Sequence, residues 1–106
     1  NHGGRQLDGA SSTINILPEI VDKVGKLVEV HLDGGIRSGQ DVIKAMCLGA
    51  KGTYIGRAFL YGLGALGKEG VTKALNIIKT EADMTMALCG RRDIHDLNRD
   101  NIYNLK

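Results

Sequence analysis

The sequence is poor in aromatic residues and in cysteine, and each shortage excludes a class of protein. Among 106 residues there are no tryptophans, one phenylalanine and three tyrosines, so stacked aromatic rings for binding single-stranded nucleic acid are not expected. The two cysteines, Cys47 and Cys89, are too few for a secreted disulfide framework, and we expect both to be reduced thiols in the core. The 14 basic and 12 acidic residues form no run of one sign, which gives no signal for nucleic acid or an anionic membrane.

Long apolar runs are lacking too. No stretch reaches the roughly 18 residues that a membrane-spanning helix requires. The opening residues NHGGR lack the basic start and the apolar stretch of a signal peptide. No spacing of His, Cys, Asp and Glu resembles a metal site. We therefore expect a cytoplasmic protein without a bound metal, or one that reaches a membrane surface through a segment outside this range.

Glycine is abundant, with 15 residues against a single proline, which indicates many tight turns. Apolar periodicity predicts helices that alternate with short strands, and this order predicts parallel strands and right-handed crossovers of the α/β class. The expected elements are a loop over 1–13, a helix beginning near Pro18, a strand over 27–33, a helix over 38–50, a strand over 51–56, a helix from 57 to about 62, a glycine-rich break, a helix over 71–88, a short helix in RRDIHDL and a loose polar tail.

Glycine and arginine follow both predicted strands. The first strand ends in Asp33-Gly34-Gly35-Ile36-Arg37, and the second ends in Gly56-Arg57 at the start of the next helix. Backbone N–H groups of such glycines can cradle a phosphate, and a helix N-terminus favours an anion. A tight strand-to-helix turn explains either loop alone, but the repeat predicts one shared phosphate site at two neighbouring strand ends, an arrangement frequent in TIM barrels.

The first loop carries a histidine and an arginine. His2 can accept a proton near neutral pH, and Arg5 presents a planar fork that matches a carboxylate. The pair suits an acid substrate with a removable proton beside its carboxylate. Such residues are also common in solvated loops, so the pair alone is a weak signal.

Three stretches resemble the FMN-dependent 2-hydroxy-acid dehydrogenases and oxidases, a family that includes glycolate oxidase, flavocytochrome b2 and bacterial L-lactate dehydrogenase. They are NHGGRQLDGA, HLDGGIRSGQDVIKAMCLGAKGTYIGRAFLYGLGALGKEGV and MTMALCG, which together extend through most of the chain to about residue 90. The resemblance implies the C-terminal part of a TIM (β/α)8 barrel, with about two parallel strands and flanking helices. It divides the chain into an active-site loop over 1–13, the last β/α units over 14–90 and a C-terminal tail over 91–106.

The resemblance also implies roles for single residues. His2 matches the active-site base, and Arg5 matches the arginine that binds the substrate carboxylate. The implied reaction oxidises an L-2-hydroxy acid to a 2-oxo acid with reduction of FMN, and L-lactate is the substrate expected first. Whether His2 takes its proton from the hydroxyl or from carbon stays open. The implied FMN phosphate loops are Asp33, Gly34, Gly35, Ile36 and Arg37, then Gly56 and Arg57.

Members of the family are several times longer, and their earlier strands supply most contacts to the flavin ring and the aspartate that pairs with the histidine. A glycolate or longer-chain hydroxy-acid oxidase, and a catalytically inert fragment, therefore remain alternatives. The electron acceptor is open. Strands of a parallel sheet are buried on both faces, and each buried aliphatic side chain is worth about 1.5–3 kcal/mol. We expect a marginal monomer that self-associates, pairs with the rest of the barrel, or packs differently from the full-length enzyme.

The remaining polar and sulfur-bearing residues are expected to be structural. Charged residues of the later helices, including Glu81, are expected on solvated faces. His31 is expected to be packed and hydrogen-bonded within its strand. The three methionines, Met46, Met84 and Met86, are expected in the helix core.

Overall fold

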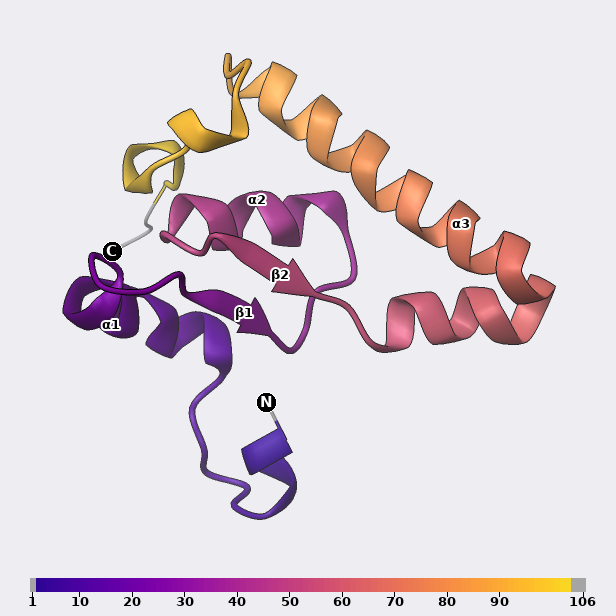
Figure 1. Cartoon of the computed structure of the whole chain (residues 1–106), viewed down its shortest axis with the longest axis horizontal. Helices are drawn as coiled ribbons and strands as arrows, with labels where there is room; N and C mark the ends of the chain where they lie inside the picture. Colours follow the sequence, from indigo (N-terminus) through magenta and orange to yellow (C-terminus); the bar gives the residue numbers. More distant parts are fainter. Residues whose placement is uncertain (1, 104–106) are drawn as a thin grey trace.

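The computed structural model describes residues 2–103 and contains two short parallel strands flanked by helices (Figure 1). In chain order the elements are η1 (His2–Arg5), α1 (Thr13–Val24), β1 (His31–Asp33), α2 (Gly39–Cys47), β2 (Gly52–Tyr54), α3 (Arg57–Leu88), η2 (Ile94–Asp96) and η3 (Arg99–Asn101). The α/β class and the pair of parallel strands predicted from the sequence are confirmed.

The two strands lie side by side with Leu32 opposite Thr53 and Asp33 opposite Tyr54. Side chains alternate across a strand, so Leu32 faces α1 and α2 and is buried, whereas His31 and Asp33 point to the opposite, exposed face. On that face the His31 ring nitrogens lie 3.3 Å from the Tyr54 hydroxyl and 3.3 Å from a Glu29 carboxylate oxygen. The expected hydrogen bonding of His31 is therefore confirmed, but its burial is not.

Two apolar clusters hold the chain together, one on each side of α2. The first joins α1, the sheet and α2 through Leu17, Leu32, Ile36, Ala45 and Ala50. The second joins α2, α3 and the C-terminal segment through Ile43, Cys47 and Leu97. Helix α2 therefore packs against every other large element, which fixes the loops at its two ends.

Several predicted boundaries were wrong. Helix α1 begins at Thr13 and keeps Pro18 inside it, because Ile14, Leu17 and Val21 pack against the first cluster and outweigh the hydrogen bond that proline removes. The predicted strand 27–33 pairs only over His31–Asp33, and Leu27 lies in an exposed turn. With a single neighbouring strand, little of this segment has a partner for its backbone groups.

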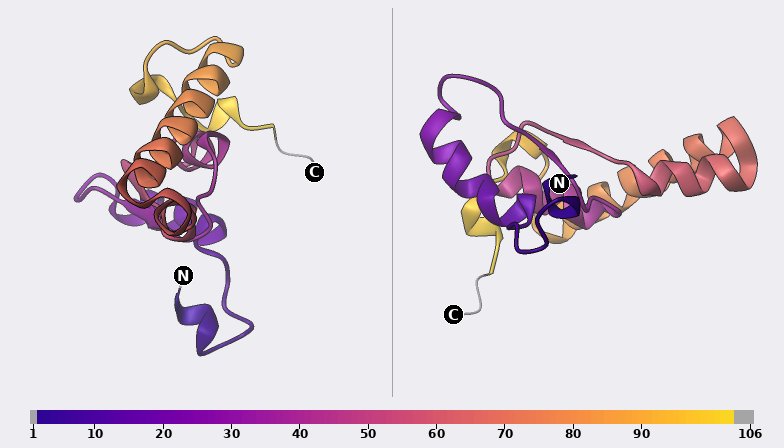
Figure 2. Two further views of the ribbon diagram at one scale, coloured as in Figure 1. Left: turned by 90° about the vertical axis from the view of Figure 1, so that its right-hand side faces the viewer. Right: turned by 90° about the horizontal axis from the view of Figure 1, so that it is seen from below.

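Helix α3 folds back on itself. Leu66 and Gly67 have non-helical backbone angles, with a φ of 58° at Gly67, so that two arms form a hairpin (Figures 1 and 2). The arms touch at Gly62 and Gly70, where a side chain on Gly70 would overlap the Gly62 carbonyl. The predicted glycine-rich break is confirmed, but it is a two-residue reversal rather than a loop.

A short helix was expected in RRDIHDL and a loose tail after it. The short helix is confirmed as η2, but the expectation of a loose tail was wrong over residues 98–102. Leu97 is buried against α2, and the Arg99 guanidinium contacts Asp22 at 2.7 Å and the Pro18 carbonyl at 3.3 Å. The segment thus crosses from the end of α3 back to α1. Residues 104–106 lie outside the described residues.

The expected cysteine and methionine burial holds only in part. Cys47 is buried, and burial raises the pKa of its thiol, with a further increase from Cys89. Cys89 follows the last turn of α3 and is exposed, and Met84 is exposed on the outer side of the same helix. Within residues 2–103 we find no helix that is both long and apolar enough to cross a bilayer.

Candidate functional site at the carboxyl ends of the strands

Both predicted anion-binding turns lie at one edge of the sheet. Because β1 and β2 are parallel and in register, Asp33 and Tyr54 end side by side, and the turns that follow leave the same edge. Arg37 and Arg57 line one pocket of about 270 Å³ at this edge. Its other lining residues come from both arms of α3 and are mainly apolar, namely Ala58, Tyr61, Ala74, Ile77 and Ile78.

The glycines of the first turn face a neighbouring pocket. Gly34 and Gly35 have φ values of 104° and 82°, which L side chains rarely adopt, and they line a pocket of about 310 Å³ beside Thr13. The Thr13 hydroxyl donates to the Asp33 carbonyl at 2.8 Å, so the start of α1 holds the end of β1 in place. The glycines and the arginine pair are thus adjacent but do not line a common pocket.

Ile36 has a different position from its neighbours in the loop. Its side chain is 5% exposed and belongs to the core cluster of Leu17 and Leu32. Only its backbone can face a ligand, and its side chain serves to anchor the loop.

The two helices that begin at this edge have different N-termini. At α2, Ser38 and Asp41 form a capping box, and Asp41 Oδ2 accepts the N–H groups of both Arg37 and Ser38 at 3.0 Å. Burial alone would raise the pKa of the Asp41 carboxyl, but these hydrogen bonds outweigh burial and lower the pKa below its ordinary value. At α3, no side chain of residues 2–103 caps Gly56, and no acidic residue lies in the first turn. Helix α3 therefore presents free N–H groups and the positive end of its dipole.

The contact made by one residue of this region was not predicted from the sequence. Glu81, expected on a solvated face, accepts a hydrogen bond from the Gly39 N–H at 2.7 Å across 42 residues of sequence. The expectation was wrong because it treated 71–88 as an isolated helix, whereas the reversal at Gly67 brings the second arm against the start of α2. No local signal in the sequence marks this contact.

His2 and Arg5 lie in the single turn η1. A three-residue repeat places positions i and i+3 one above the other, so both side chains lie on one side of the turn, and both are exposed. In Figure 1 and in the left view of Figure 2 the segment before α1 stands away from the sheet. The structure thus brings His2 close to Arg5 but does not bring either against the strand ends.

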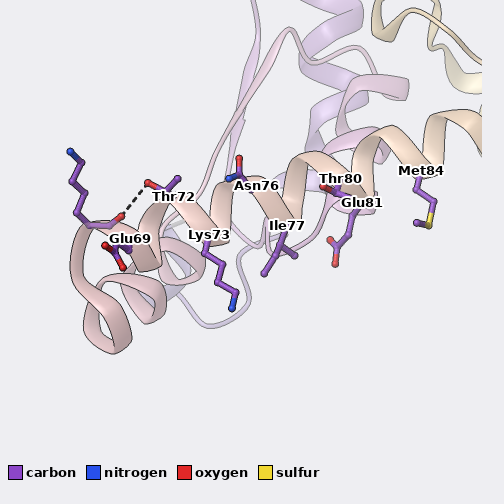
Figure 3. A pocket seen from close by; sticks show the side chains of 9 residues that line it. Glu69, Thr72, Lys73, Asn76, Ile77, Thr80, Glu81 and Met84 are labelled. Carbon is purple, nitrogen blue, oxygen red and sulfur yellow. Dashed lines mark hydrogen bonds between the residues drawn. The ribbon is translucent and has the colours of Figure 1, made fainter.

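A wider hollow of about 670 Å³ lies elsewhere, along the second arm of α3 (Figure 3). All of its lining residues lie between Lys68 and Met84, and one hydrogen bond within the helix, from the Thr72 hydroxyl to the Lys68 carbonyl, is drawn there. It is an open helix surface without loop residues, and we do not place the site there.

Parallel strands linked through a helix, with glycine–arginine turns gathered at their carboxyl edge, are typical of an α/β protein of the barrel type. The chain belongs to the FMN-dependent dehydrogenase family, whose sequence model matches residues 1–104. FMN is the cofactor of that family.

Individual relatives agree with this assignment. The chain is 48% identical over 102 residues to a peroxisomal (S)-2-hydroxyacid oxidase of Arabidopsis thaliana and 51% identical over 98 residues to an L-lactate dehydrogenase of Caulobacter vibrioides. These matches cover 96% and 92% of this chain but 28% and 26% of the relatives. A soluble mutant of the membrane-associated (S)-mandelate dehydrogenase from Pseudomonas putida superposes with a TM-score of 0.92 at 45% identity, over 99% of this chain and 30% of that one. The predicted family and barrel architecture are confirmed.

Proposed function

We propose that this chain contributes the FMN phosphate site and the active-site base to an enzyme that oxidises an L-2-hydroxy acid to the 2-oxo acid. The observation that carries the proposal is the pairing of Arg37 and Arg57 on one pocket, beside the uncapped start of α3. Two guanidinium groups and a helix N-terminus together suit a phosphate dianion. Because the chain spans under a third of its relatives, the activity of the whole protein is part of the proposal.

The residues present fit the phosphate end of FMN. The pocket of about 270 Å³ is smaller than the roughly 300–1,000 Å³ of sites that enclose a drug-sized ligand, so it has room for the phosphate end of FMN but not for the whole cofactor. Gly56 and Arg57 would offer the backbone N–H groups at the start of α3, and Gly34 and Gly35 would offer theirs from the adjoining turn. When bound, FMN supplies the two-electron acceptor for the substrate.

We assign His2 as the base and Arg5 as the partner of the substrate carboxylate. Their position on one side of η1 supports this assignment, because a 2-hydroxy acid carries its reacting carbon next to its carboxylate. His2 would accept a proton at a ring nitrogen while Arg5 holds the carboxylate oxygens. Hydride transfer and proton abstraction from carbon both remain compatible with this role.

L-Lactate is the substrate we propose first, and a glycolate or longer-chain hydroxy acid is the alternative. An L-lactate dehydrogenase and 2-hydroxyacid oxidases are about equally similar to this chain, which supports the reaction class more than the substrate. We propose the assignment of residues 1–13, 14–90 and 91–106 to active-site loop, β/α units and tail. For location we propose a cytoplasmic protein or one attached to a membrane surface, and a monotopic membrane dehydrogenase among the similar structures supports the second alternative.

The test compares binding of FMN with binding of riboflavin, which lacks the phosphate. We expect FMN to bind more tightly, and Arg57→Met to weaken FMN by about tenfold or more without changing riboflavin, since a hydrogen bond to a charged group is lost. Arg92→Met is the matched control, because Arg92 is an exposed cation beyond the other end of α3. Equal affinity for FMN and riboflavin in the unaltered chain would contradict the proposed phosphate site.

A separate assay tests the chemistry. Turnover of L-lactate with an artificial electron acceptor, abolished by His2→Asn while FMN stays bound, would support catalysis by this chain itself. If the protein binds FMN but is inert with L-lactate and glycolate, the chain holds the cofactor without completing the active site. That result would favour the inert alternative.

A further inference from the structure

The start of α2 is surrounded by two carboxylates from different parts of the chain. Asp41 accepts the N–H groups of Arg37 and Ser38, and Glu81 of α3 accepts the N–H group of Gly39 at 2.7 Å. The Ser38 hydroxyl accepts the Asp41 N–H at 3.2 Å. These contacts satisfy the backbone N–H groups of four residues, Arg37, Ser38, Gly39 and Asp41. The positive end of the α2 dipole therefore already faces two carboxylates, and an anion at this edge is left with the start of α3, the glycine turn and the arginine side chains.

Close packing supports the contact made by Glu81. Gly39 is buried, and a side chain there would overlap backbone atoms of Ile78, Glu81 and Ala82. The backbone of α2 thus rests directly on the backbone of α3. Ile78, on the same turn of α3, also lines the pocket of Arg37 and Arg57.

Helix α3 therefore meets the strand ends twice. It begins there with Arg57, reverses at Gly67, and returns so that Glu81 reaches Gly39. Because Arg37 lies two residues before Gly39, the hydrogen bond between Glu81 and Gly39 constrains the backbone position of Arg37. One helix thereby fixes both arginines relative to each other.

We propose that Glu81 is a positioning residue for the anion site, acting through Gly39 on Arg37. This inference rests on the proposed phosphate site but goes beyond it, because Glu81 does not line the pocket that the two arginines share. Glu81 acts by accepting the hydrogen bond from the Gly39 N–H, and its carboxylate faces the N-terminal end of α2.

The experiment uses three variants and the ratio of riboflavin to FMN dissociation constants, which isolates the contribution of the phosphate. Glu81→Leu removes the acceptor, and we expect the ratio to fall by about threefold to tenfold with riboflavin affinity unchanged. Glu81→Gln keeps an amide oxygen for Gly39, and we expect it to restore the ratio to within about twofold of the unaltered chain. Glu69→Leu is the matched control, since Glu69 also lies on α3 and borders the same outer hollow (Figure 3).

Amide hydrogen exchange gives a second readout that needs no ligand. The Gly39 and Arg37 amides should exchange faster in Glu81→Leu than in Glu81→Gln, while the interior of α2 is unchanged. An unaltered ratio in Glu81→Leu overturns the positioning role. A Gln variant that behaves like the Leu variant overturns the role of the hydrogen bond in favour of charge. If the unaltered chain does not prefer FMN, the proposed phosphate site fails first, and this inference fails with it.

Discussion

Asp41 shows how a single side chain organises the candidate site. Its carboxylate accepts two backbone N–H groups before α2, and its own N–H completes the capping box with Ser38. The loop from Gly34 to Arg37 is thereby attached to a rigid helix at one end and to β1 at the other. Asp41 lies outside the pocket that the two arginines share but lines the neighbouring pocket of Gly34 and Gly35, so it holds the turn backbone between the two.

This arrangement predicts a pH dependence. Because the folded-state pKa of Asp41 is lowered, its stabilising contribution is fully present above the ordinary pKa of 3.8 and is lost as the pH falls through the lowered pKa. In Asp41→Asn that part of the acid dependence should disappear. Urea unfolding of both proteins at pH 7 and at about pH 3 measures it, with Asp96→Asn, an exposed aspartate, as the control. A difference between the proteins that is the same at both pH values would contradict the prediction.

Residue positions followed from the sequence where they depend on local structure and failed where they depend on distant contacts. Glycine and arginine immediately after a strand predicted the position of Arg37 and Arg57, because parallel strand ends must meet at one edge. The contact of Glu81 with Gly39 depends on where α3 reverses and at what angle it returns. No property of the residues around Glu81 encodes that angle.

At the scale of elements, the reversal of α3 is the feature that shapes the site. Gly67 provides the backbone conformation, and the Gly62–Gly70 contact allows the arms to approach. Neither arm alone would enclose the pocket, since Ala58 comes from the first arm and Ile78 from the second.

The contact between the arms can be tested with two glycines of the same helix. In Gly70→Ala the new methyl group meets the Gly62 backbone, and we expect a loss of about 1–3 kcal/mol in the free energy of unfolding. In Gly64→Ala the methyl group meets no atom within 4 Å, and the better helix propensity of alanine should stabilise the protein by up to about 1 kcal/mol. Thermal or urea denaturation followed by circular dichroism measures both. If Gly70→Ala is as stable as Gly64→Ala, the arms do not pack as described.

The same contrast explains which elements the sequence predicted. Helix α2 was predicted nearly in full because its polar start and apolar face are both local signals. The length of β1 was not, since a strand extends only as far as it has a partner. The C-terminal segment reads as polar, and only the burial of Leu97 against α2 reveals that it is anchored.

At the scale of the whole molecule, apolar surface is left uncovered. Val28 is 59% exposed, Tyr54 is 58% exposed on the helix-free face, and each strand pairs on one side only. Such open edges and faces favour association with another chain.

We therefore expect the isolated chain to self-associate. Size-exclusion chromatography with light scattering at tens of micromolar should give a mass above the 11.4 kDa of a monomer. A charged substitution on the helix-free face, Tyr54→Lys, should shift the protein toward the monomer, whereas Asn76→Lys on the outer side of α3 should not. A clean monomer of the unaltered chain at this concentration would contradict the expectation.

The reversal within α3 also keeps the molecule shorter than a straight helix of the same number of residues would be. A straight helix of 32 residues would measure about 48 Å at 1.5 Å per residue, which exceeds the 41 Å of the longest dimension of the molecule. The reversal at Leu66 and Gly67 therefore lets the 32-residue helix fit within the molecule as two shorter arms. If the angle between the two arms opened by a few degrees, Arg57 on the first arm would move away from Glu81 on the second arm. Because Glu81 holds the turn that carries Arg37, the two arginines would then separate.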